Sequence, residues 1–261
     1  MSDGAPGAAG PAVTYMVADG VATVTLDRPE ARNVLDAEPL VLLLDALARA
    51  AADASVRVVV LTGKGRAFCA GADLRGAGGG GFTTAGARVF ADVLAALLDH
   101  PKPTIARVQG HVAGGGNGLV AACDLAVASS AARFAFSEVR VGVAPSMISV
   151  VCLRVMHPRA AAELMLTGER VGAERALAAG LLTSVVAPEL LDATVAAWVE
   201  QLRLGGPEAM AATKQLLRRI PAMERSEAFA WTAELSAALF AGAEAADGMS
   251  AFVERRPPTW A

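Results

Sequence analysis

A glycine-rich stretch joins a predicted strand to a predicted helix: Gly110-His111-Val112-Ala113-Gly114-Gly115-Gly116-Asn117-Gly118-Leu119. The strand is expected at Thr104–Val108 and the short helix at Gly115–Ala122. Glycines let a ligand approach the main chain closely. The free N–H groups at a helix N-terminus, together with the helix dipole, favour negative charge there. The stretch therefore predicts a candidate anion site, although a tight turn that needs glycine is an equally good interpretation.

On either side of this stretch, predicted strands and helices alternate through the first half of the chain. Val13–Val17 and Val21–Leu26 form a predicted hairpin across Ala18-Asp19-Gly20. The other predicted elements are a helix from Asp36 to about Ala52, a buried strand at Val56–Leu61, a helix at Thr83–Asp99, and strands at Asp124–Ala128 and Arg133–Phe136. Such alternation implies crossover connections and stacked parallel sheets, so the predicted fold class is α/β.

From Pro145 onward the predicted elements are mostly helices. They are Pro145–Val155, Pro158–Leu166, Ala173–Ala179, Pro188–Arg203, Pro207–Arg218 and Glu224–Ala241, with one strand at Thr183–Val186. Several begin near a proline, whose missing N–H costs nothing at that position. The alanine-rich faces of the last third suit packing between subunits, and they suit an ordinary core layer equally well. No internal repeat is present, and no linker is long enough to separate two domains.

The composition limits the class of protein. The chain has 261 residues, of which 54% are hydrophobic, and a formal net charge of −3, so it can bury a large core. The longest stretch without an acidic residue, lysine or arginine, Val108–Cys123, is short for a membrane span and contains five glycines. Only three of its basic residues are lysines, and they form no stripe. We therefore expect a cytoplasmic protein that binds neither a membrane nor nucleic acid.

The N-terminus and the cysteines add two expectations. Residues 1–12 are rich in glycine, alanine and proline and lack the basic and apolar segments of a signal peptide, so we expect a disordered tail. Cys69, Cys123 and Cys152 are too few and too scattered for a disulfide framework or a zinc site. Their apolar neighbours indicate buried thiols in a reducing compartment.

A second loop of small residues, Phe68-Cys69-Ala70-Gly71-Ala72-Asp73, follows the buried strand Val56–Leu61 by one turn. If it faces the first glycine-rich stretch, main-chain N–H groups from both can hold one oxygen that becomes anionic, which is an oxyanion hole. Gly76, Gly78 and Gly81 also satisfy the dinucleotide pattern G-x-G-x-x-G. No strand directly precedes them, so a flexible loop is the favoured interpretation.

Seven motifs occur in the order in which a known family has them. They are Thr23-Val24-Thr25-Leu26-Asp27-Arg28-Pro29, Ala67-Phe68-Cys69-Ala70-Gly71-Ala72-Asp73-Leu74, Gly110-His111-Val112-Ala113-Gly114-Gly115-Gly116, Ala122-Cys123-Asp124, Phe136-Ser137-Glu138-Val139-Arg140-Val141-Gly142, Leu166-Thr167-Gly168-Glu169-Arg170 and Gly248-Met249-Ser250-Ala251-Phe252-Val253-Glu254-Arg255-Arg256. From about Val13 to Trp260 the chain resembles the crotonase, or enoyl-CoA hydratase/isomerase, superfamily. One motif alone would be weak, whereas seven in order are specific.

The resemblance implies a fold and a ligand. The expected fold is a ββα spiral of stacked sheets over residues 13–190, followed by a helical C-terminal region over 191–261 that forms homotrimers or dimers of trimers. The expected ligand is an acyl-CoA thioester. No metal or redox cofactor is implied, because CoA arrives as part of the substrate.

The resemblance also implies the residues of the site. The N–H groups of Ala72 and Gly115 would hold the thioester oxygen while an enolate forms, and Glu138 would move the proton. Burial among apolar neighbours would raise the Glu138 pKa towards neutrality. The implied positions for binding substrate or CoA are Arg28, Ala70, Gly71, Asp73, Leu74, Gly114, Gly118 and Arg255.

One position departs from the hydratase pattern. Hydratases of this superfamily use two glutamates; the second matches Glu138, but the first matches Gly118. Adding water across a double bond divides the work between two carboxylates, whereas moving the double bond can be done by one base. The departure favours an enoyl-CoA isomerase over a hydratase. A CoA-dependent hydrolase or decarboxylase, and a non-catalytic acyl-CoA-binding protein, remain as alternatives.

Overall fold

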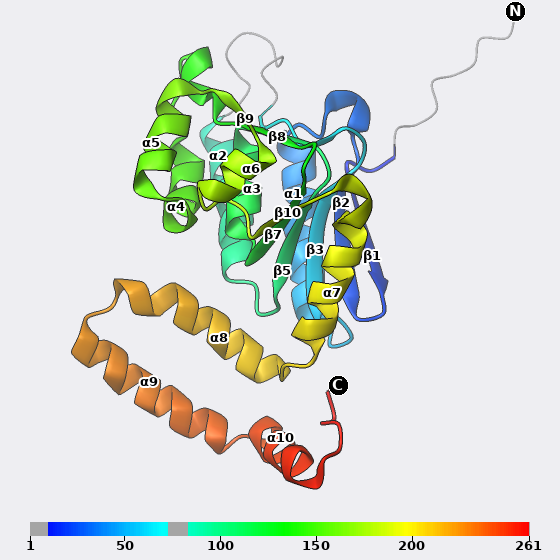
Figure 1. Ribbon diagram of the computed structural model, residues 1–261, viewed down its shortest axis with the longest axis vertical. Coiled ribbons are helices and arrows are strands. Elements are labelled where there is room, and N and C mark those ends of the chain that lie inside the picture. Colours follow the sequence, from blue (N-terminus) through cyan, green and yellow to red (C-terminus); the bar gives the residue numbers. More distant parts are fainter. Residues whose placement is uncertain (1–9, 73–82, 261) are drawn as a thin grey trace, which may run out of the picture.

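The computed structural model describes residues 10–72 and 83–260 (Figure 1). Its larger sheet has six strands in the order β1-β2-β3-β5-β7-β10. β1 and β2 form an antiparallel hairpin, and every other neighbouring pair in this sheet is parallel. The strands are β1 (Val13–Ala18), β2 (Val21–Leu26), β3 (Val58–Gly63), β5 (Thr104–Val108), β7 (Leu125–Ser129) and β10 (Ser184–Val186).

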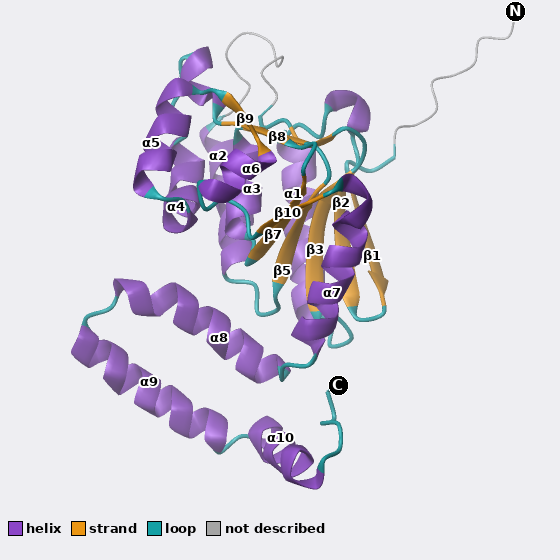
Figure 2. Cartoon of the chain, in the orientation of Figure 1, coloured by secondary structure: helices purple, strands orange, loops and turns teal. Residues whose placement is uncertain are grey.

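A second sheet of four short strands lies at the end of the larger one (Figure 2). Its order is β4 (Ala67–Cys69), β6 (His111–Ala113), β8 (Arg133–Ala135) and β9 (Arg170–Gly172). β4, β6 and β8 each follow β3, β5 or β7 within a few residues, so each long strand continues into a short one. Since β4, β6 and β8 pair in parallel, their carboxyl ends lie side by side.

Helices cover the sheets and share the core with the strands. They are α1 (Ala37–Ala52), α2 (Thr84–Leu98), α3 (Gly115–Ala122), α4 (Ser146–Val155), α5 (Pro158–Thr167) and α6 (Ala173–Ala178). The N-cap side chains of Asp36 and Thr83 accept hydrogen bonds from Glu38 N and Gly86 N, so α1 and α2 begin where these donors are satisfied. α3 packs between α2 and α4. This three-helix layer lies directly behind the carboxyl ends of the short strands.

The C-terminal helices divide into one that packs on the sheet and three that stand apart from it (Figure 1). They are α7 (Leu191–Arg203), α8 (Pro207–Arg219), α9 (Arg225–Phe240) and α10 (Ala243–Glu254). Apolar residues of α7 form a second core cluster with β3, β5 and β7. α9 has no buried residue at all. The described residues also contain the 3₁₀ helices η1 (Pro29–Ala31), η3 (Ser137–Val141), η4 (Pro188–Leu190) and η5 (Ile220–Ala222).

Most of the predicted elements are present with small changes of boundary. The predicted helix over Pro188–Arg203 is divided into η4 and α7, and β3 begins two residues later than the predicted strand Val56–Leu61. The sequence did not predict β4, β6, β9 or α10. Three-residue strands are too short to show a periodic pattern, which explains why β4, β6 and β9 were not predicted, whereas β8 lies within the predicted strand Arg133–Phe136. No helix in the described ranges is long and apolar enough to cross a membrane.

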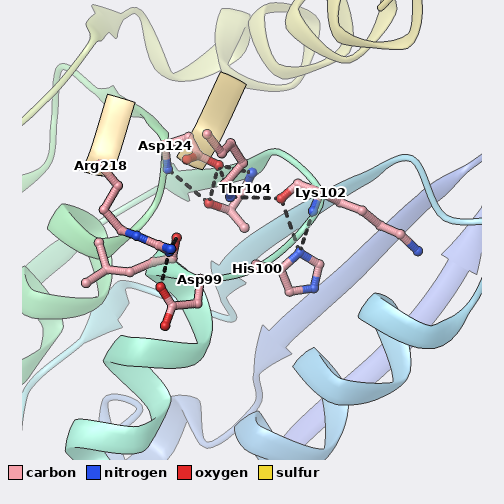
Figure 3. A network of polar contacts seen from close by, with 8 residues as sticks. Asp99, His100, Lys102, Thr104, Asp124 and Arg218 are labelled. Atoms are coloured by element: carbon pink, nitrogen blue, oxygen red, sulfur yellow. Dashed lines mark hydrogen bonds and ion pairs between the residues drawn. The ribbon is translucent and has the colours of Figure 1, made fainter. Parts of the chain in front are cut away.

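α8 is fastened to the core by charged side chains (Figure 3). Lys214 Nζ lies 2.6 Å from Asp124 Oδ2, and this carboxylate also accepts hydrogen bonds from the main-chain N and side-chain Oγ1 of Thr104. One turn further along α8, Arg218 pairs with Asp99. Asp124 directly follows the C-cap of α3. The position of α8 is therefore tied to the end of the helix that begins at the glycine-rich stretch.

This arrangement predicts that Asp124→Ala is markedly destabilising. The substitution leaves the Thr104 donors and a Lys214 side chain that is only 10% exposed without their shared acceptor, and we expect a loss of roughly 2–3 kcal/mol in unfolding free energy. The matched control is Asp192→Ala, which removes a partner of Arg107 that is 81% exposed and should cost less than about 1 kcal/mol. Chemical denaturation measures both; equal losses would contradict the assignment.

Candidate active site

Two loops that are far apart in sequence meet at the carboxyl ends of β4 and β6. Gly71 has φ of +83°, and a Cβ placed on it would lie 2.9 Å from Ala113 O and 3.2 Å from Gly115 N. A side chain at this position would therefore collide with the facing main chain, so glycine permits the approach. Leu35 N donates to Gly71 O at 2.8 Å and holds the loop from the other side. The structure thus brings the two glycine-containing loops together.

The N-terminus of α3 lies at this meeting point. Gly115 is the first residue of α3, and an N–H group in the first turn of a helix has no intrahelical partner. Ala72 follows Gly71 directly and pairs with Leu35 in an isolated parallel bridge. The main chain of residues 70–72 therefore runs past the end of α3. An oxygen placed here would meet main-chain donors and the positive end of a helix dipole.

Glu138 lies beside the same loops, in η3 directly after β8. A Cβ placed on Gly114 would be 3.7 Å from Glu138 Oε1. The other carboxylate oxygen, Oε2, is buried and has no hydrogen-bond partner among the described residues. Burial raises the pKa of the Glu138 carboxyl, an effect that its own main-chain N–H partly offsets. A carboxyl group whose pKa is raised by burial is in an environment that suits proton transfer.

No arginine neutralises this carboxylate in the described part of the chain. Arg133 and Arg140 are the nearest in sequence, and both donate to main-chain carbonyls elsewhere: Arg133 to residues 130–132 and Arg140 to Thr167. The alternative in which Glu138 is a surface partner of Arg133 or Arg140 therefore has no support. The Cys152 thiol has its pKa raised by burial and also by the charge of Glu138, which indicates that the two side chains are neighbours.

Asn117 is a residue of the site that the sequence did not single out. It is fully buried in α3, and its Nδ2 donates to Ala135 O at 2.9 Å. Gly114 N donates to the same carbonyl at 3.1 Å. Ala135 ends β8 three residues before Glu138. These two bonds set the glycine-rich stretch against the segment that carries Glu138; a polar residue in an apolar helix was the signal available for finding it.

Gly118, the position without a carboxylate, is covered by neighbouring side chains. A Cβ placed on it would lie 2.6 Å from Ile148 Cγ2 and 3.4 Å from Leu94 Cδ2. Gly118 is buried, and so are both of these side chains. The sequence analysis did not identify Ile148 either, because an isoleucine in a predicted helix is ordinarily interpreted as a core residue. Whatever binds at the loops does not meet an ionisable group on this face of α3.

The comparisons with known proteins agree with this geometry. A family model described as enoyl-CoA hydratase/isomerase matches residues 17–261. The chain belongs to this family. A Thermus thermophilus protein that bears the name of an enoyl-CoA hydratase is 38% identical over 249 residues, which cover 91% of this chain and 96% of that protein. The (E)-benzylidenesuccinyl-CoA hydratase of Thauera aromatica is 35% identical over 253 residues, covering 95% and 98%.

A solved structure shows the same fold in this family. The enoyl-CoA hydratase of Mycobacterium smegmatis superimposes with a TM-score of 0.90 at 38% sequence identity, and the match covers 96% of this chain and 99% of that one. The predicted resemblance to the crotonase superfamily is thus confirmed, and so is the α/β fold class. The likeness extends over both the sheets and the C-terminal helices.

The remaining predicted binding positions of this family member fall into three groups. Ala70 lies in the loop beside Gly71, and Asp73 and Leu74 lie outside the described residues. Arg28 is engaged in ion pairs with Asp36, at 2.6 Å, and with Glu38. Arg255 ends α10, at the opposite end of the protomer from the short sheet (Figure 1). Within one protomer the structure does not bring Arg255 to the loops.

The buried cysteines are not candidates for nucleophilic chemistry. Burial raises the pKa of the Cys69 and Cys123 thiols to about 12, so both are protonated near neutral pH. Cys69 Sγ instead accepts a hydrogen bond from Gly71 N at 3.4 Å and thereby supports the loop. Within residues 10–72 and 83–260, no cluster of three or more His, Cys, Asp or Glu side chains is arranged to hold a metal ion.

The raised pKa of Glu138 predicts a pH-dependent difference in stability. Above the folded-state pKa, Glu138 is ionised in both states, but its charge is partly desolvated in the folded protein and fully solvated in the unfolded chain. This difference lowers the free energy of unfolding, and Glu138→Gln removes the loss. The variant should therefore melt at a higher temperature than the wild type at pH 7.5. Its advantage should disappear as the pH falls below the ordinary glutamate pKa of about 4.3, where both states are protonated.

Thermal unfolding over pH 4–8 measures this difference. Glu163→Gln is the matched control, because Glu163 is an exposed partner of Arg175 and its replacement should give no stabilisation at any pH. If Glu138→Gln is less stable than the wild type at pH 7.5, the carboxylate has a partner that stabilises its charge, and the assignment of a desolvated base is wrong.

Proposed function

We propose that this member of the enoyl-CoA hydratase/isomerase family uses Glu138 as its single acid–base group on an enoyl-CoA thioester. The observation that carries the proposal is the buried Glu138 oxygen without a partner, beside the loops where Gly71 meets Gly115. A base and a set of main-chain donors at one place suit a reaction in which a proton leaves the carbon next to a carbonyl. No metal or redox cofactor takes part in this chemistry; CoA is part of the substrate.

The reaction that one carboxylate performs best is migration of a double bond. Ionised Glu138 removes a proton from C2 of a 3-enoyl-CoA, and the electron pair moves to the thioester oxygen. The N–H groups of Ala72 and Gly115 hold that oxygen, each contributing about 3–4 kcal/mol in the transition state. When the electron pair returns, the thioester carbonyl re-forms, and C4 takes the proton from the Glu138 carboxyl. The product is the conjugated 2-enoyl-CoA, and no atom is gained or lost.

Hydration of a 2-enoyl-CoA is the second candidate function. The relatives favour it, since both curated relatives and the solved structure described above carry hydratase names. In this chain the water would have to be activated, and C2 protonated, with Glu138 as the only carboxylate of the pair. A non-catalytic acyl-CoA-binding protein is the third candidate, supported by the glycine at position 118 and opposed by the retained Glu138.

One absorbance assay separates these candidates. Isomerisation of 3-hexenoyl-CoA creates the conjugated thioester chromophore, whereas hydration of crotonyl-CoA removes it. We expect the wild type to act on 3-hexenoyl-CoA faster than on crotonyl-CoA, and its kcat/KM to rise with pH through the raised pKa of Glu138. A protein that binds acyl-CoA by calorimetry and changes neither absorbance is a binder. Release of free CoA would indicate a hydrolase.

Glu138→Gln tests the assigned base directly. The amide keeps the size of the side chain but cannot accept the C2 proton, so turnover should fall by about 100-fold or more. The affinity for a saturated acyl-CoA, measured by calorimetry, should stay within about threefold, because binding and proton transfer use different groups. Glu163→Gln, on the exposed face of α5, serves as the control and should leave turnover unchanged. Unchanged turnover in Glu138→Gln would contradict the proposal.

We also propose that α9 and α10 pack against further copies of this chain in a homotrimer or a dimer of trimers. Neither helix packs on the sheets of its own protomer (Figure 1). α9 has no buried residue, while Phe229 and Phe240 on it and Phe252 on α10 are exposed. A second copy is the natural occupant of such a surface, because exposed aromatic side chains of this number lower solubility unless covered.

Light scattering after size-exclusion chromatography tests the assembly. The expected mass is three or six times the 26.5 kDa of one chain. Replacing both Phe229 and Phe240 with glutamate should reduce the mass towards that of one chain without changing the far-ultraviolet circular dichroism, because no contact within the protomer core is lost. Glu227→Gln on the same helix should keep the wild-type mass. A wild type that is monomeric at micromolar concentration would contradict this proposal.

A further inference from the structure

We propose that Ile148 is the residue that limits this site to one acid–base group, because it occupies the room that any side chain at position 118 would need. The inference deepens the proposed function and rests on it for its chemistry. Its structural part, the fit between Ile148 and Gly118, stands on the packing alone and can be tested without any substrate.

The contact between α4 and α3 leaves no space for a side chain at position 118. A Cβ on Gly118 would be 2.6 Å from Ile148 Cγ2 and 3.2 Å from Ile148 Cβ. Carbon atoms that are not bonded pack no closer than about 3.5 Å. Ile148 is 2% exposed and Leu94 is 4% exposed, so neither has solvent to move into. A β-branched side chain in a helix also has one strongly preferred χ1 rotamer, which keeps Cγ2 over Gly118.

Gly118 lies in line with the candidate oxyanion site. It is three residues after Gly115, so the two share one face of α3. A Cβ on Gly115 would meet Phe90 of α2 at 3.2 Å, and a Cβ on Gly118 would meet Leu94, one turn further along α2, at 3.4 Å. Phe90, Leu94 and Ile148 therefore form one apolar wall along this face. The wall begins beside the Gly115 amide and passes directly over Gly118.

This apolar wall limits which side chains can act on the face of α3 that carries Gly118. A carboxylate at position 118 would be placed against the isoleucine and leucine side chains, and burial among apolar groups disfavours the ionised form. The adjacent polar residue of α3, Asn117, donates from its Nδ2 to Ala135 O of β8. The three atoms nearest to a Cβ on Gly118 all belong to the apolar side chains of Ile148 and Leu94. Packing therefore opposes a second carboxylate at this position, in addition to the glycine itself.

A stability cycle tests the packing. Gly→Ala inside a helix ordinarily stabilises it, yet Gly118→Ala should lower the melting temperature because its methyl group meets Ile148. In the Ile148→Ala background the same substitution should cost clearly less, because Cγ2 has been removed. Gly86→Ala in α2 is the matched control: its Cβ would meet only Thr83 Oγ1, at 3.6 Å, and it should raise the melting temperature. A neutral Gly118→Ala, or an equal loss in both backgrounds, would overturn the proposal.

A gain of hydration tests the chemical part. Gly118→Glu alone should hydrate crotonyl-CoA no faster than the wild type, because the side chain cannot be accommodated. The double variant Gly118→Glu with Ile148→Ala should hydrate at least tenfold faster than its control, Gly118→Gln with Ile148→Ala, which has the same bulk and no carboxylate. The proposal is wrong if Gly118→Glu alone matches the double variant, or if the Glu and Gln double variants are equal.

Failure of the proposed function and failure of the packing between Ile148 and Gly118 give different results. If wild-type protein changes no enoyl-CoA, or if Glu138→Gln keeps full turnover, the proposed function is wrong while the stability cycle still reports on Ile148 and Gly118. If either double variant yields no folded protein, the cycle with alanine at both positions, which introduces no buried polar group, decides whether Ile148 closes this space.

Discussion

The close approach of two main-chain segments, at Gly71 and at Gly114–Gly115, is the constraint on which the rest of the structure depends. A side chain at position 71 would collide with Ala113 O and with Gly115 N. Three short parallel strands, β4, β6 and β8, bring these segments and the Glu138 segment to one edge. Each of these strands is only three residues long and follows β3, β5 or β7 within a few residues.

A site built mainly from main-chain groups needs few special side chains. The hydrogen bonds that support it come from Leu35 N to Gly71 O, from Gly114 N to Ala135 O, and from Asn117 Nδ2 to the same carbonyl. Among the described residues, Glu138 Oε2 is one of three buried side-chain atoms without a hydrogen-bond partner, with Asn117 Oδ1 and Tyr15 OH, and burial raises the pKa of the Glu138 carboxyl. An unpaired buried carboxylate lowers the stability of the folded protein. That cost is the expected signature of a group kept ready to accept a proton.

Helix α3 links the site to the C-terminal arm, which is formed by α8, α9 and α10. α3 begins at Gly115 beside the loops and ends at Ala122, with Cys123 as its C-cap. The next residue, Asp124, holds Lys214 of α8 and both donors of Thr104 (Figure 3). The arm is therefore held by a residue that directly follows the helix of the site, even though most of the arm lies away from the sheets.

The sequence by itself was sufficient for the family, for the α/β class and for the long elements. The helical period of α1, the continuous apolar run of β3 and the order of seven motifs are local properties that need no coordinates. The absence of a carboxylate at position 118 was equally plain. The short strands β4, β6 and β9, and the helix α10, were not predicted, because three residues carry no periodicity and α10 was interpreted only as a motif.

Only the tertiary structure decided four features of the site. Gly71 meets Gly115, Glu138 Oε2 has no hydrogen-bond partner among the described residues, Asp36 pairs with Arg28, and Ile148 covers Gly118. The physical reason is the same in each case. Which atoms lie within contact distance is set by how strands pair and helices pack, and residues far apart in the chain contribute to every one of these contacts. The sequence determines which chemical groups the chain contains. Packing determines which of these groups come into contact, which are buried, and where the space beside a residue is filled.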